Sequence, residues 1–467
     1  MQDQLKQFEA QFGTDIVSEA PQTYLEEPRG RYYSKPRVLL RPKTVDDVSS
    51  IIRFCNERKI GVIPYAGGTG LVGGQVSDQD SLVLLSVERM TALRGIYPDE
   101  MVIEVEAGMI LADVQQYARD ADRLFPLSLA AEGSARIGGN LATNAGGLNV
   151  LRYGNARDLC LGLEAVLPNG DIHHGLKRLR KDNTGFDLKN LLIGSEGTLG
   201  VITAASLKLF ASPKHAVTAM LGVESPKSAI SLLSHLRENF GDIVTGFELI
   251  SAQGPAFLAE VMPQVACPLS PVPDWIVLTE LSSGYDQDLG DTLETSLAGL
   301  METGLITDAA IAQNEAQRTA FWEMRESIPE ANRLIGSVSS HDISLPISSI
   351  PDFIAEMTPK LEALDLRVNC FGHLGDGNLH YNVFPAIGRQ KSEYQSMRDQ
   401  IKEMVHDAVH ARDGSVSAEH GIGRLKTGDL RKYGDPTKLA AISAIKNSLD
   451  PNGIMNPGVI IENAPSE

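Results

Sequence analysis

The chain has 467 residues, which is too long for one ordinary hydrophobic core, so two or more domains are expected. Hydrophobic residues make up 42% and charged residues 22%, as in a soluble globular protein. A formal net charge of -18 argues against a nucleic-acid partner, because phosphate binding needs clustered Lys and Arg.

The cysteines and the N-terminus bear on the compartment. Cys55, Cys160, Cys267 and Cys370 lack CxxC spacing, which argues against a disulfide scaffold, a zinc ribbon or an iron–sulfur site and suits a reducing compartment. The N-terminus, MQDQLKQFEAQFG, lacks a signal-peptide core, and no apolar run is long enough to span a bilayer. We therefore expect a cytoplasmic protein without a transmembrane segment, and a peripheral membrane contact stays open.

The first regular elements follow a short helix and an irregular lead-in over residues 1–35. Residues 37–42 predict a short strand that ends at a proline. Thr44 is a candidate N-cap for the next helix, whose apolar stripe runs over Val48, Ile51, Ile52 and Cys55 at helical spacing. A further strand is expected over residues 60–64.

The first glycine tract is PYAGGTGLVGG, residues 64–74. It contains a formal GxGxxG at Gly68, Gly70 and Gly73, the pattern of a Rossmann dinucleotide site. That motif must open a crossover helix, whereas here a turn-rich run leads into another strand at 81–86, which argues against a Rossmann unit. The loop either binds phosphate through successive N–H groups or is a structural turn.

Two further tracts of small residues follow. A strand is expected at 101–107, a helix at 109–120, and then the tract 133–147, which has too few side chains to build a core. Such a tract suits backbone that lies against a large flat ligand or its phosphates. A strand is expected at 163–167, and His173 and His174 on the next strand are expected at the surface. The third group is IGSEGTLGVIT, residues 193–203.

Beyond residue 214 the composition changes. A strand at 217–223, a helix at 228–240 and further alternation to about residue 304 predict a smaller sheet with helices on one face. Residues 317–332 predict a helix that contains Trp322 and Arg325. A last helix is expected at 437–449, after which Asn456 and its neighbours return to the first domain.

The stretch FGHLGDGNLHYN, residues 371–382, carries the clearest candidate chemistry. Turn formers between two strand-like runs would bring His380 back beside His373. Two imidazoles can bind a divalent metal with a third ligand, and Glu419 in SAEHGIG, after the strand-like run 414–418, is the best candidate. Paired histidines near a turn are also often structural, and that alternative stays open.

Together these motifs resemble a known family. The order PYAGGTGLVGG, IGGNLATNAGG with RYG, and IGSEGTLGVIT is similar to the FAD-binding domain of the vanillyl-alcohol oxidase / p-cresol methylhydroxylase (PCMH) superfamily. FGHLGDGNLHYN, SAEHGIG and DPNGIMNPG resemble its D-2-hydroxy-acid dehydrogenase branch, which includes D-lactate and D-2-hydroxyglutarate dehydrogenases. The similarity covers residues 37 to 459.

This resemblance implies an α+β fold in three segments. Residues 1–212 would form a two-subdomain FAD-binding domain of the PCMH type. Residues 213–425 would form an α+β cap, or substrate, domain with an antiparallel sheet and the metal site. Residues 426–467 would form a helical segment that returns to the FAD domain.

The resemblance also implies the cofactor contacts. The first two tracts would wrap the diphosphate, and an EGTLG strand would run along the flavin. Some superfamily members attach the flavin through a histidine, but these tracts contain none, so noncovalent FAD is expected. The implied cofactor residues are Pro64, Gly67, Gly68, Thr69, Gly70, Leu71, Gly138, Gly139, Asn140, Thr143, Gly146, Gly147, Tyr153, Glu196, Gly197, Ile202 and Asn456.

The family pattern places Arg325 on the substrate carboxylate, which a bidentate guanidinium suits. The D-2-hydroxyglutarate enzymes resemble one another in a hydroxyl residue four positions later and a Lys just before the next strand. This chain has Pro329 and Ser340 there, which puts recognition of a distal carboxylate in question. Arg424 and Lys426 either supply that charge or are solvated surface residues.

The hypothesis is oxidation of an (R)-2-hydroxy acid to a 2-oxo acid, with hydride transfer to the flavin. A divalent cation would stabilise the developing alkoxide; zinc is the first choice, and manganese, iron or cobalt would also fit. His420 would be the general base, because an imidazole takes a proton near neutral pH. The metal ligands would be His373, His380 and Glu419, with Arg325, Asn382 and His373 at the substrate.

Two rival functions stay open. A metal-dependent hydrolase would explain the His and Glu cluster but leave three glycine tracts without a role. The flavin subunit of a larger glycolate- or lactate-oxidising electron-transfer complex is the other. The electron acceptor, whether an electron-transfer flavoprotein, a quinone or a cytochrome, is not specified by the sequence, and a homodimer is an open alternative.

Overall fold

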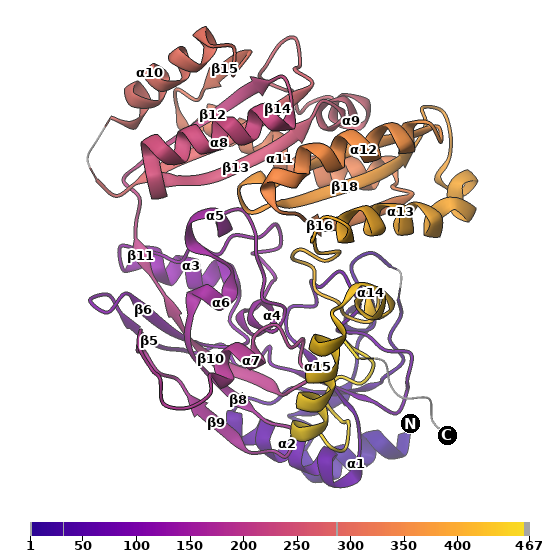
Figure 1. Cartoon of the computed structure of the whole chain (residues 1–467). Helices are drawn as coiled ribbons and strands as arrows, with labels where there is room; N and C mark the ends of the chain where they lie inside the picture. The colour runs from indigo at the N-terminus through magenta and orange to yellow at the C-terminus, as the bar shows by residue number, and fades with distance from the viewer. Residues whose placement is uncertain (1, 31, 286–287, 462–467) are drawn as a thin grey trace. The chain divides into compact units, whose positions relative to one another are not determined.

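A computed structural model describes residues 2–30, 32–285 and 288–461 (Figure 1). The chain divides into two compact units. The first consists of Met1–Gly147, Tyr153–Ser212 and Glu419–Glu467, and the second of Leu148–Arg152 and Pro213–Ala418. The main segment of the second unit begins at Pro213, and the chain returns to the first unit at Glu419. Residues 462–467 of the expected last segment lie outside the described residues.

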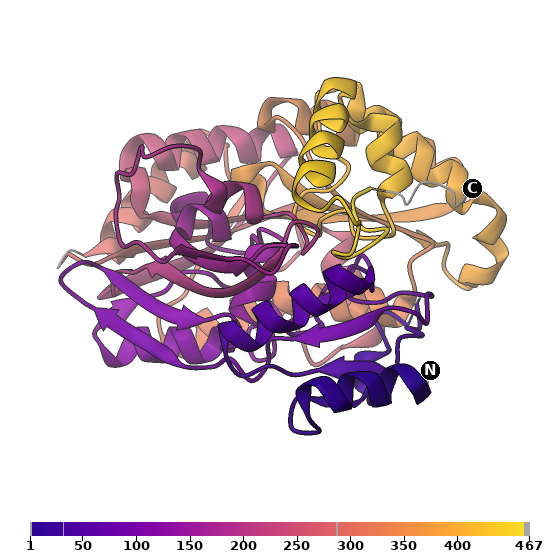
Figure 2. The ribbon, with the colours of Figure 1, turned by 90° about the horizontal axis from the view of Figure 1, so that it is seen from below.

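The first unit contains a four-stranded and a five-stranded sheet. The strand orders are β1-β2-β4-β3 and β5-β6-β10-β8-β9. Strands β2, β4 and β3 run parallel, whereas all pairings in the second sheet are antiparallel. The C-terminal segment, yellow in Figure 2, returns to β3 through a bridge between Met455 and Val62. The strands are β1 (Val17–Glu19), β2 (Val38–Leu40), β3 (Val62–Tyr65), β4 (Val83–Ser86), β5 (Leu93–Tyr97), β6 (Val102–Glu106), β7 (Arg123–Leu124), β8 (Cys160–Val166), β9 (Ile172–Gly175), β10 (Val201–Lys208) and β11 (Phe210–Ala211).

Helix α2 (Val45–Arg58) forms where the cap and the apolar stripe in the sequence predict it. Thr44 and Asp47 form a reciprocal capping box, with both hydrogen bonds 3.1 Å long. The apolar stripe from Val48 to Cys55 is buried in a core that includes residues of both sheets. The other helices are α1 (Gln2–Phe12), α3 (Leu111–Asp120), α4 (Ile137–Ala142), α6 (Ala156–Leu159), α7 (Leu188–Leu192), α14 (Thr427–Tyr433) and α15 (Pro436–Leu449), with α5 (Val150–Tyr153) at the division between the units.

The glycine tracts differ in backbone conformation. No helix follows the first tract, because β4 comes next, so the expectation against a Rossmann unit is confirmed. The expectation that EGTLG is a strand is wrong. Gly194, Glu196 and Gly197 have φ of 80°, 52° and 73°, which belong to a tight turn, and β10 begins only at Val201.

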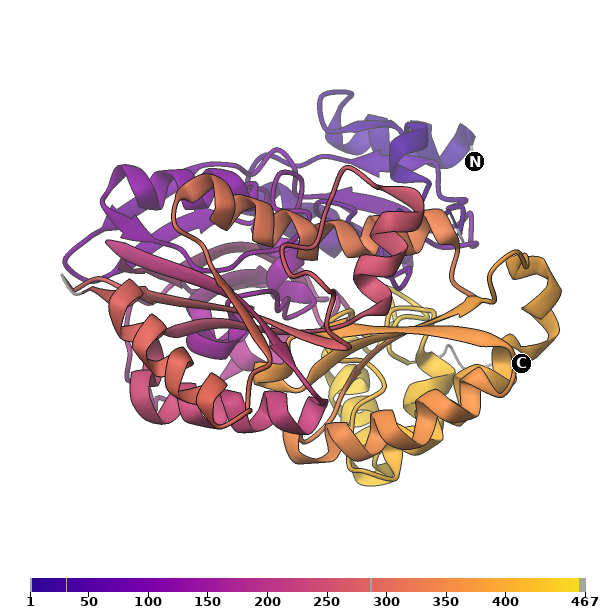
Figure 3. The ribbon, with the colours of Figure 1, turned by 90° about the horizontal axis from the view of Figure 1, so that it is seen from above.

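The second unit is built on a seven-stranded antiparallel sheet, in the order β15-β12-β14-β13-β17-β18-β16. The expectation that helices cover one face is wrong: α9 and α11 lie on one face, and α8, α10, α12 and α13 lie on the other (Figure 3). Both faces are apolar, since Val277 and Leu278, adjacent on β14, are each fully buried. The elements are β12 (His215–Val223), α8 (Pro226–Phe240), β13 (Val244–Ser251), α9 (Gln253–Val261), β14 (Trp275–Ser283), α10 (Leu289–Glu302), β15 (Asp308–Ile311), α11 (Glu315–Ile335), β16 (Ser339–Ser344), α12 (Ile350–Glu362), β17 (Leu366–Gly372), β18 (Asn378–Pro385) and α13 (Arg398–His410).

The predicted turn between His373 and His380 is confirmed. A 3₁₀ turn, η4 (Leu374–Asp376), joins β17 to β18. Gly377 closes it at φ 85°, and a Cβ there would lie 2.3 Å from the carbonyl oxygen of Leu345, so only glycine fits. The expected strand at 414–418 is not formed: Ser415 makes only an isolated bridge to Ser344.

Candidate cofactor and metal sites

The first unit brings the three glycine tracts together. Gly67 lies against Ser134 and the backbone up to Arg136, so the first tract meets the start of the second. Gly139 of α4 lies against Ala66. The turn of the third tract reaches Pro64, which lies beside Gly197. Segments more than 100 residues apart in the sequence therefore line one small region of backbone.

This backbone offers the donors that a diphosphate needs. Among the described residues, none accepts a hydrogen bond from the N–H groups of residues 67–71, which are only half-buried. The side-chain nitrogen of Asn140 is buried and also has no acceptor there. Successive unbonded N–H groups form an anion-binding concavity, so the residues present fit the diphosphate of FAD.

The surroundings of the Glu196 carboxylate differ from those expected of a cofactor ligand. Its carboxylate accepts hydrogen bonds from the N–H groups of Ile422 (2.8 Å) and Gly423 (2.7 Å), in the loop after Glu419. Burial raises its pKa, and these two N–H groups oppose that rise. Gly421 has φ 81°, and a Cβ there would lie 2.8 Å from the carboxylate. The Glu196 side chain therefore fixes this loop.

Three more of the predicted cofactor residues are involved in packing or bonding within the first unit. Tyr153 packs edge-to-face on Phe210, with ring centroids 4.7 Å apart. The hydroxyl of Thr143 donates to the carbonyl of Gly139 at 3.0 Å. Asn456 donates to the carbonyls of Gly74 and Glu196, while its own side-chain oxygen is buried without a donor among the described residues.

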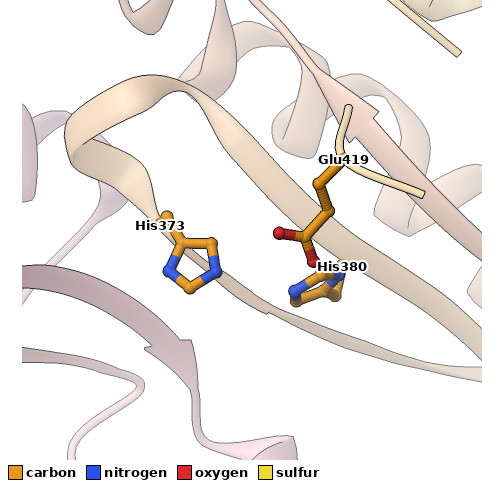
Figure 4. Close-up of side chains that lie close together, drawn as sticks. All are labelled: His373, His380 and Glu419. Carbon is orange, nitrogen blue, oxygen red and sulfur yellow. The ribbon is translucent and has the colours of Figure 1, made fainter. Parts of the chain in front are cut away.

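The proposed metal ligands lie close together (Figure 4). The ligand atoms of His373, His380 and Glu419 are all within 4.8 Å of one another. The imidazole centroids of His373 and His380 are 5.8 Å apart, and the carboxylate of Glu419 points toward them. Two imidazole nitrogens and one carboxylate oxygen match the ligand set of catalytic zinc sites, which keep a position for substrate or water.

The position of Glu419 follows from the preceding residue. Glu419 is bonded to Ala418 of the second unit, and the N–H of Ala418 donates to the carbonyl of Asp342 at 3.2 Å. Glu419 is therefore only one residue away from a hydrogen bond to β16, a strand of the sheet that carries the two histidines. His420 follows, with its Nε2 3.8 Å from a carboxylate oxygen of Glu419.

The sequence did not reveal Glu248, which bonds to both His373 and Arg325. Its carboxylate is fully buried on β13, accepts a hydrogen bond from Arg325 Nε at 2.7 Å, and bonds to Nδ1 of His373. Burial alone would raise its pKa, but Arg325 and His373 outweigh that effect and lower the pKa to about 2. The only signal in the sequence was a charged residue inside the apolar run FELI.

Arg325 is a buried arginine, and only one of its guanidinium nitrogens, Nε, donates a hydrogen bond to a described residue. Its side chain is 6% exposed, and its guanidinium lies 5.0 Å from the ring centre of Phe371. Glu248 takes the Nε donor, and the two terminal nitrogens donate to no other described residue. An anionic group with two oxygens would satisfy both terminal nitrogens.

Two further carboxylates near the histidines were also missed. Asp342 lies 3.9 Å from Nδ1 of His380 and accepts a hydrogen bond from the Asn378 amide at 3.0 Å. Burial raises the pKa of Asp376 to about 6, and His373 opposes that rise. Asn382, predicted to orient substrate, lies two residues after His380 on β18, and therefore on the same face of the strand.

The residues weighed for a distal carboxylate are placed as follows. Arg424 donates from Nε to the carbonyl of Val76 and from Nη1 to that of Pro457, so it serves the backbone of the first unit. Pro329 lies inside α11, one turn beyond Arg325. Ser340 is exposed, and its hydroxyl is 2.7 Å from that of Ser337.

Comparison with known proteins identifies the family. Residues 36–175 match the family described as FAD binding domain, and residues 212–460 match that described as FAD linked oxidases, C-terminal domain. The mitochondrial D-2-hydroxyglutarate dehydrogenase of Danio rerio is 39% identical over 421 residues, covering 90% of this chain and 77% of that protein. A D-2-hydroxyglutarate–pyruvate transhydrogenase of Saccharomyces cerevisiae is 33% identical over 454 residues, covering 95% and 90%. The structure of p-cresol methylhydroxylase with substrate bound superposes with a TM-score of 0.77 at 17% identity, covering 99% and 97%.

The chain therefore belongs to the FAD-linked oxidases, and the PCMH-type fold expected from the motifs is confirmed. Within that class it is an FAD-linked dehydrogenase of the D-2-hydroxy-acid type, similar to D-2-hydroxyglutarate dehydrogenases. Each helix in the described part of the chain is too short or too polar to cross a membrane.

Proposed function

We propose that the protein oxidises a D-2-hydroxy acid of the D-2-hydroxyglutarate or D-lactate type to the 2-oxo acid, with noncovalent FAD and a divalent cation, zinc first. The observation that carries this is Arg325, a buried arginine whose terminal nitrogens lack partners among the described residues and whose Nε shares a carboxylate with His373. In this proposal the site for the substrate carboxylate adjoins the site for the cation. The names of the relatives support the same substrate class.

In this proposal different side chains bind the substrate carboxylate, the substrate hydroxyl and the cation. Arg325 binds the substrate carboxylate through its two terminal nitrogens, which fixes the acid at one end. Asn382 shares a strand face with His380 and orients the substrate hydroxyl. His373, His380 and Glu419 hold the cation, which when bound would make the substrate hydroxyl more acidic.

His420 completes the set as the general base. A neutral imidazole takes a proton near neutral pH, and the neighbouring carboxylate of Glu419 stabilises the resulting positive charge. The residues that would hold the diphosphate of FAD are the glycine loop 67–71 and Asn140. When bound, FAD supplies the hydride acceptor.

The choice of acid depends on recognition of a second carboxylate. Pro329 has no side-chain donor, and the hydroxyl of Ser340 is already close to that of Ser337. This arrangement favours an acid without a distal carboxylate, while the names of the relatives favour D-2-hydroxyglutarate. Both acids therefore belong in the first experiment.

The remaining parts of the proposal concern location and partners. All four cysteines are free thiols, which suits a reducing compartment, and the cytoplasm is the proposed location. Electrons leave to an external acceptor, an electron-transfer flavoprotein, a quinone or a cytochrome. Copurification with a further subunit would favour a larger electron-transfer complex.

The test is anaerobic mixing of the purified flavoprotein with D-2-hydroxyglutarate, D-lactate and D-malate, followed by flavin absorbance. Bleaching by one D-acid, absent with its L-enantiomer and lost after chelation, is the expected result. A yellow protein bleached by none of these acids would refute the proposed substrate class. Bleaching that survives chelation would refute the metal assignment alone.

A further inference from the structure

We infer that Glu248 is a positioning residue that sets both the metal ligand His373 and the substrate anchor Arg325 through one buried carboxylate. This inference rests on the proposed function and deepens it. The two partners occupy different oxygens: Nδ1 of His373 bonds to Oε1, and Nε of Arg325 bonds to Oε2 at 2.7 Å. One rigid group thereby links the two ends of the substrate site.

At His373 the carboxylate decides which nitrogen is available. An ionised carboxylate has no proton to donate, so Nδ1 of His373 must carry the hydrogen. In the neutral ring this leaves the lone pair on Nε2, the atom that can bind a metal. A carboxylate that fixes the tautomer and orientation of a ligating histidine is a common support of metal sites.

At Arg325 the same carboxylate fixes the plane of the guanidinium. The Nε donor is used by Glu248, and the position over the ring of Phe371 restricts rotation further. The two terminal nitrogens are left for a ligand in a fixed orientation. The spacing between the metal ligand His373 and the carboxylate anchor Arg325 would thus be set by one residue.

A purely structural role would have a different signature. If Glu248 only balanced the buried charge of Arg325, it would stabilise the fold, and its replacement would not change the affinity for the metal. Glu280 offers a matched control on the neighbouring strand β14. Its carboxylate accepts from Arg318 Nε and Trp322 Nε1, both at 3.0 Å, on the same helix α11 and away from the histidines.

The experiment compares the FAD-loaded wild type with Glu248→Gln, Glu248→Asp and the control Glu280→Gln. Metal is removed by chelation, and each protein is titrated with Zn²⁺ against a chromophoric chelator. Both Glu248 variants should bind Zn²⁺ about 10- to 100-fold more weakly, with a comparable rise in KM for the D-acid, and Glu280→Gln should match the wild type. Glu248→Asp keeps the charge but is too short to reach both partners.

Folded Glu248 variants with wild-type Zn²⁺ affinity and KM would overturn the inference. If neither variant folds, ¹⁵N-histidine spectra of the metal-free wild type decide: His373 should carry hydrogen on Nδ1, and a ring with hydrogen only on Nε2 would overturn it. If no D-acid reduces the wild-type flavin, the proposed function fails, whereas Zn²⁺ affinity still tests Glu248. If the wild type turns over and the variants equal it, only the Glu248 inference fails.

Discussion

Acidification should destabilise the second unit through Glu248. The pKa of this carboxyl is about 2 in the folded chain, against an ordinary value of 4.5, because Arg325 and His373 outweigh the effect of burial. That difference corresponds to ~3 kcal/mol of unfolding free energy at neutral pH. Since the folded pKa is the lower one, this stability is fully present above about pH 4.5 and is lost as the pH falls toward 2.

The two tryptophans make the measurement specific to this unit. Trp275 and Trp322 are the only tryptophans of the chain, and both lie in the second unit, so their fluorescence follows its unfolding. Urea titrations of metal-free protein at pH 7 and pH 3 would compare the wild type with Glu248→Gln. The variant should be less stable by ~3 kcal/mol at pH 7 and by less than half of that at pH 3.

Glu356→Gln is the matched control for this series. Burial is slight at Glu356 on α12, and hydrogen bonds from Lys360 and Arg412 lower its pKa in the same direction. An exposed pair of this kind contributes roughly 0–1 kcal/mol, so the control should show a small difference at both pH values. A difference between wild type and Glu248→Gln that does not change with pH would refute the reasoning.

Three further predictions concern activity. Glu419→Gln should abolish the chelator-sensitive turnover and bound metal while leaving the flavin spectrum unchanged; metal analysis showing full occupancy would contradict this. Gly421→Ala should lower kcat and cost about 1–3 kcal/mol, because φ is 81° and the new Cβ would lie 2.8 Å from the Glu196 carboxylate; unchanged kcat would show that the loop tolerates it. Pro329→Thr with Ser340→Lys should lower KM for D-2-hydroxyglutarate about 10-fold relative to D-lactate, or ~1.4 kcal/mol, by steady-state kinetics; an equal change for both acids would exclude a role in specificity.

Local sequence signals predicted the local structure well. Thr44 and the stripe ending at Cys55 define α2 because capping and helical periodicity act within a few residues. The turn that returns His380 to His373 follows from glycines that alone accept its backbone angles. By contrast, the strand expected at 414–418 did not form, because a strand needs a partner and Ser415 finds only a single bridge.

The sequence by itself determined the family and many of the helices and turns, since these depend on motifs and on short-range periodicity, and it predicted His373, His380 and Glu419 as candidate metal ligands. Only the tertiary structure showed that Glu248, 125 residues before His373 in the chain, bonds to both His373 and Arg325. It also showed that Glu196 bonds to the loop after Glu419, 226 residues away at Ile422. Pairings of this kind depend on how strands and loops meet in space, and a buried carboxylate does not reveal its partners in the sequence around it.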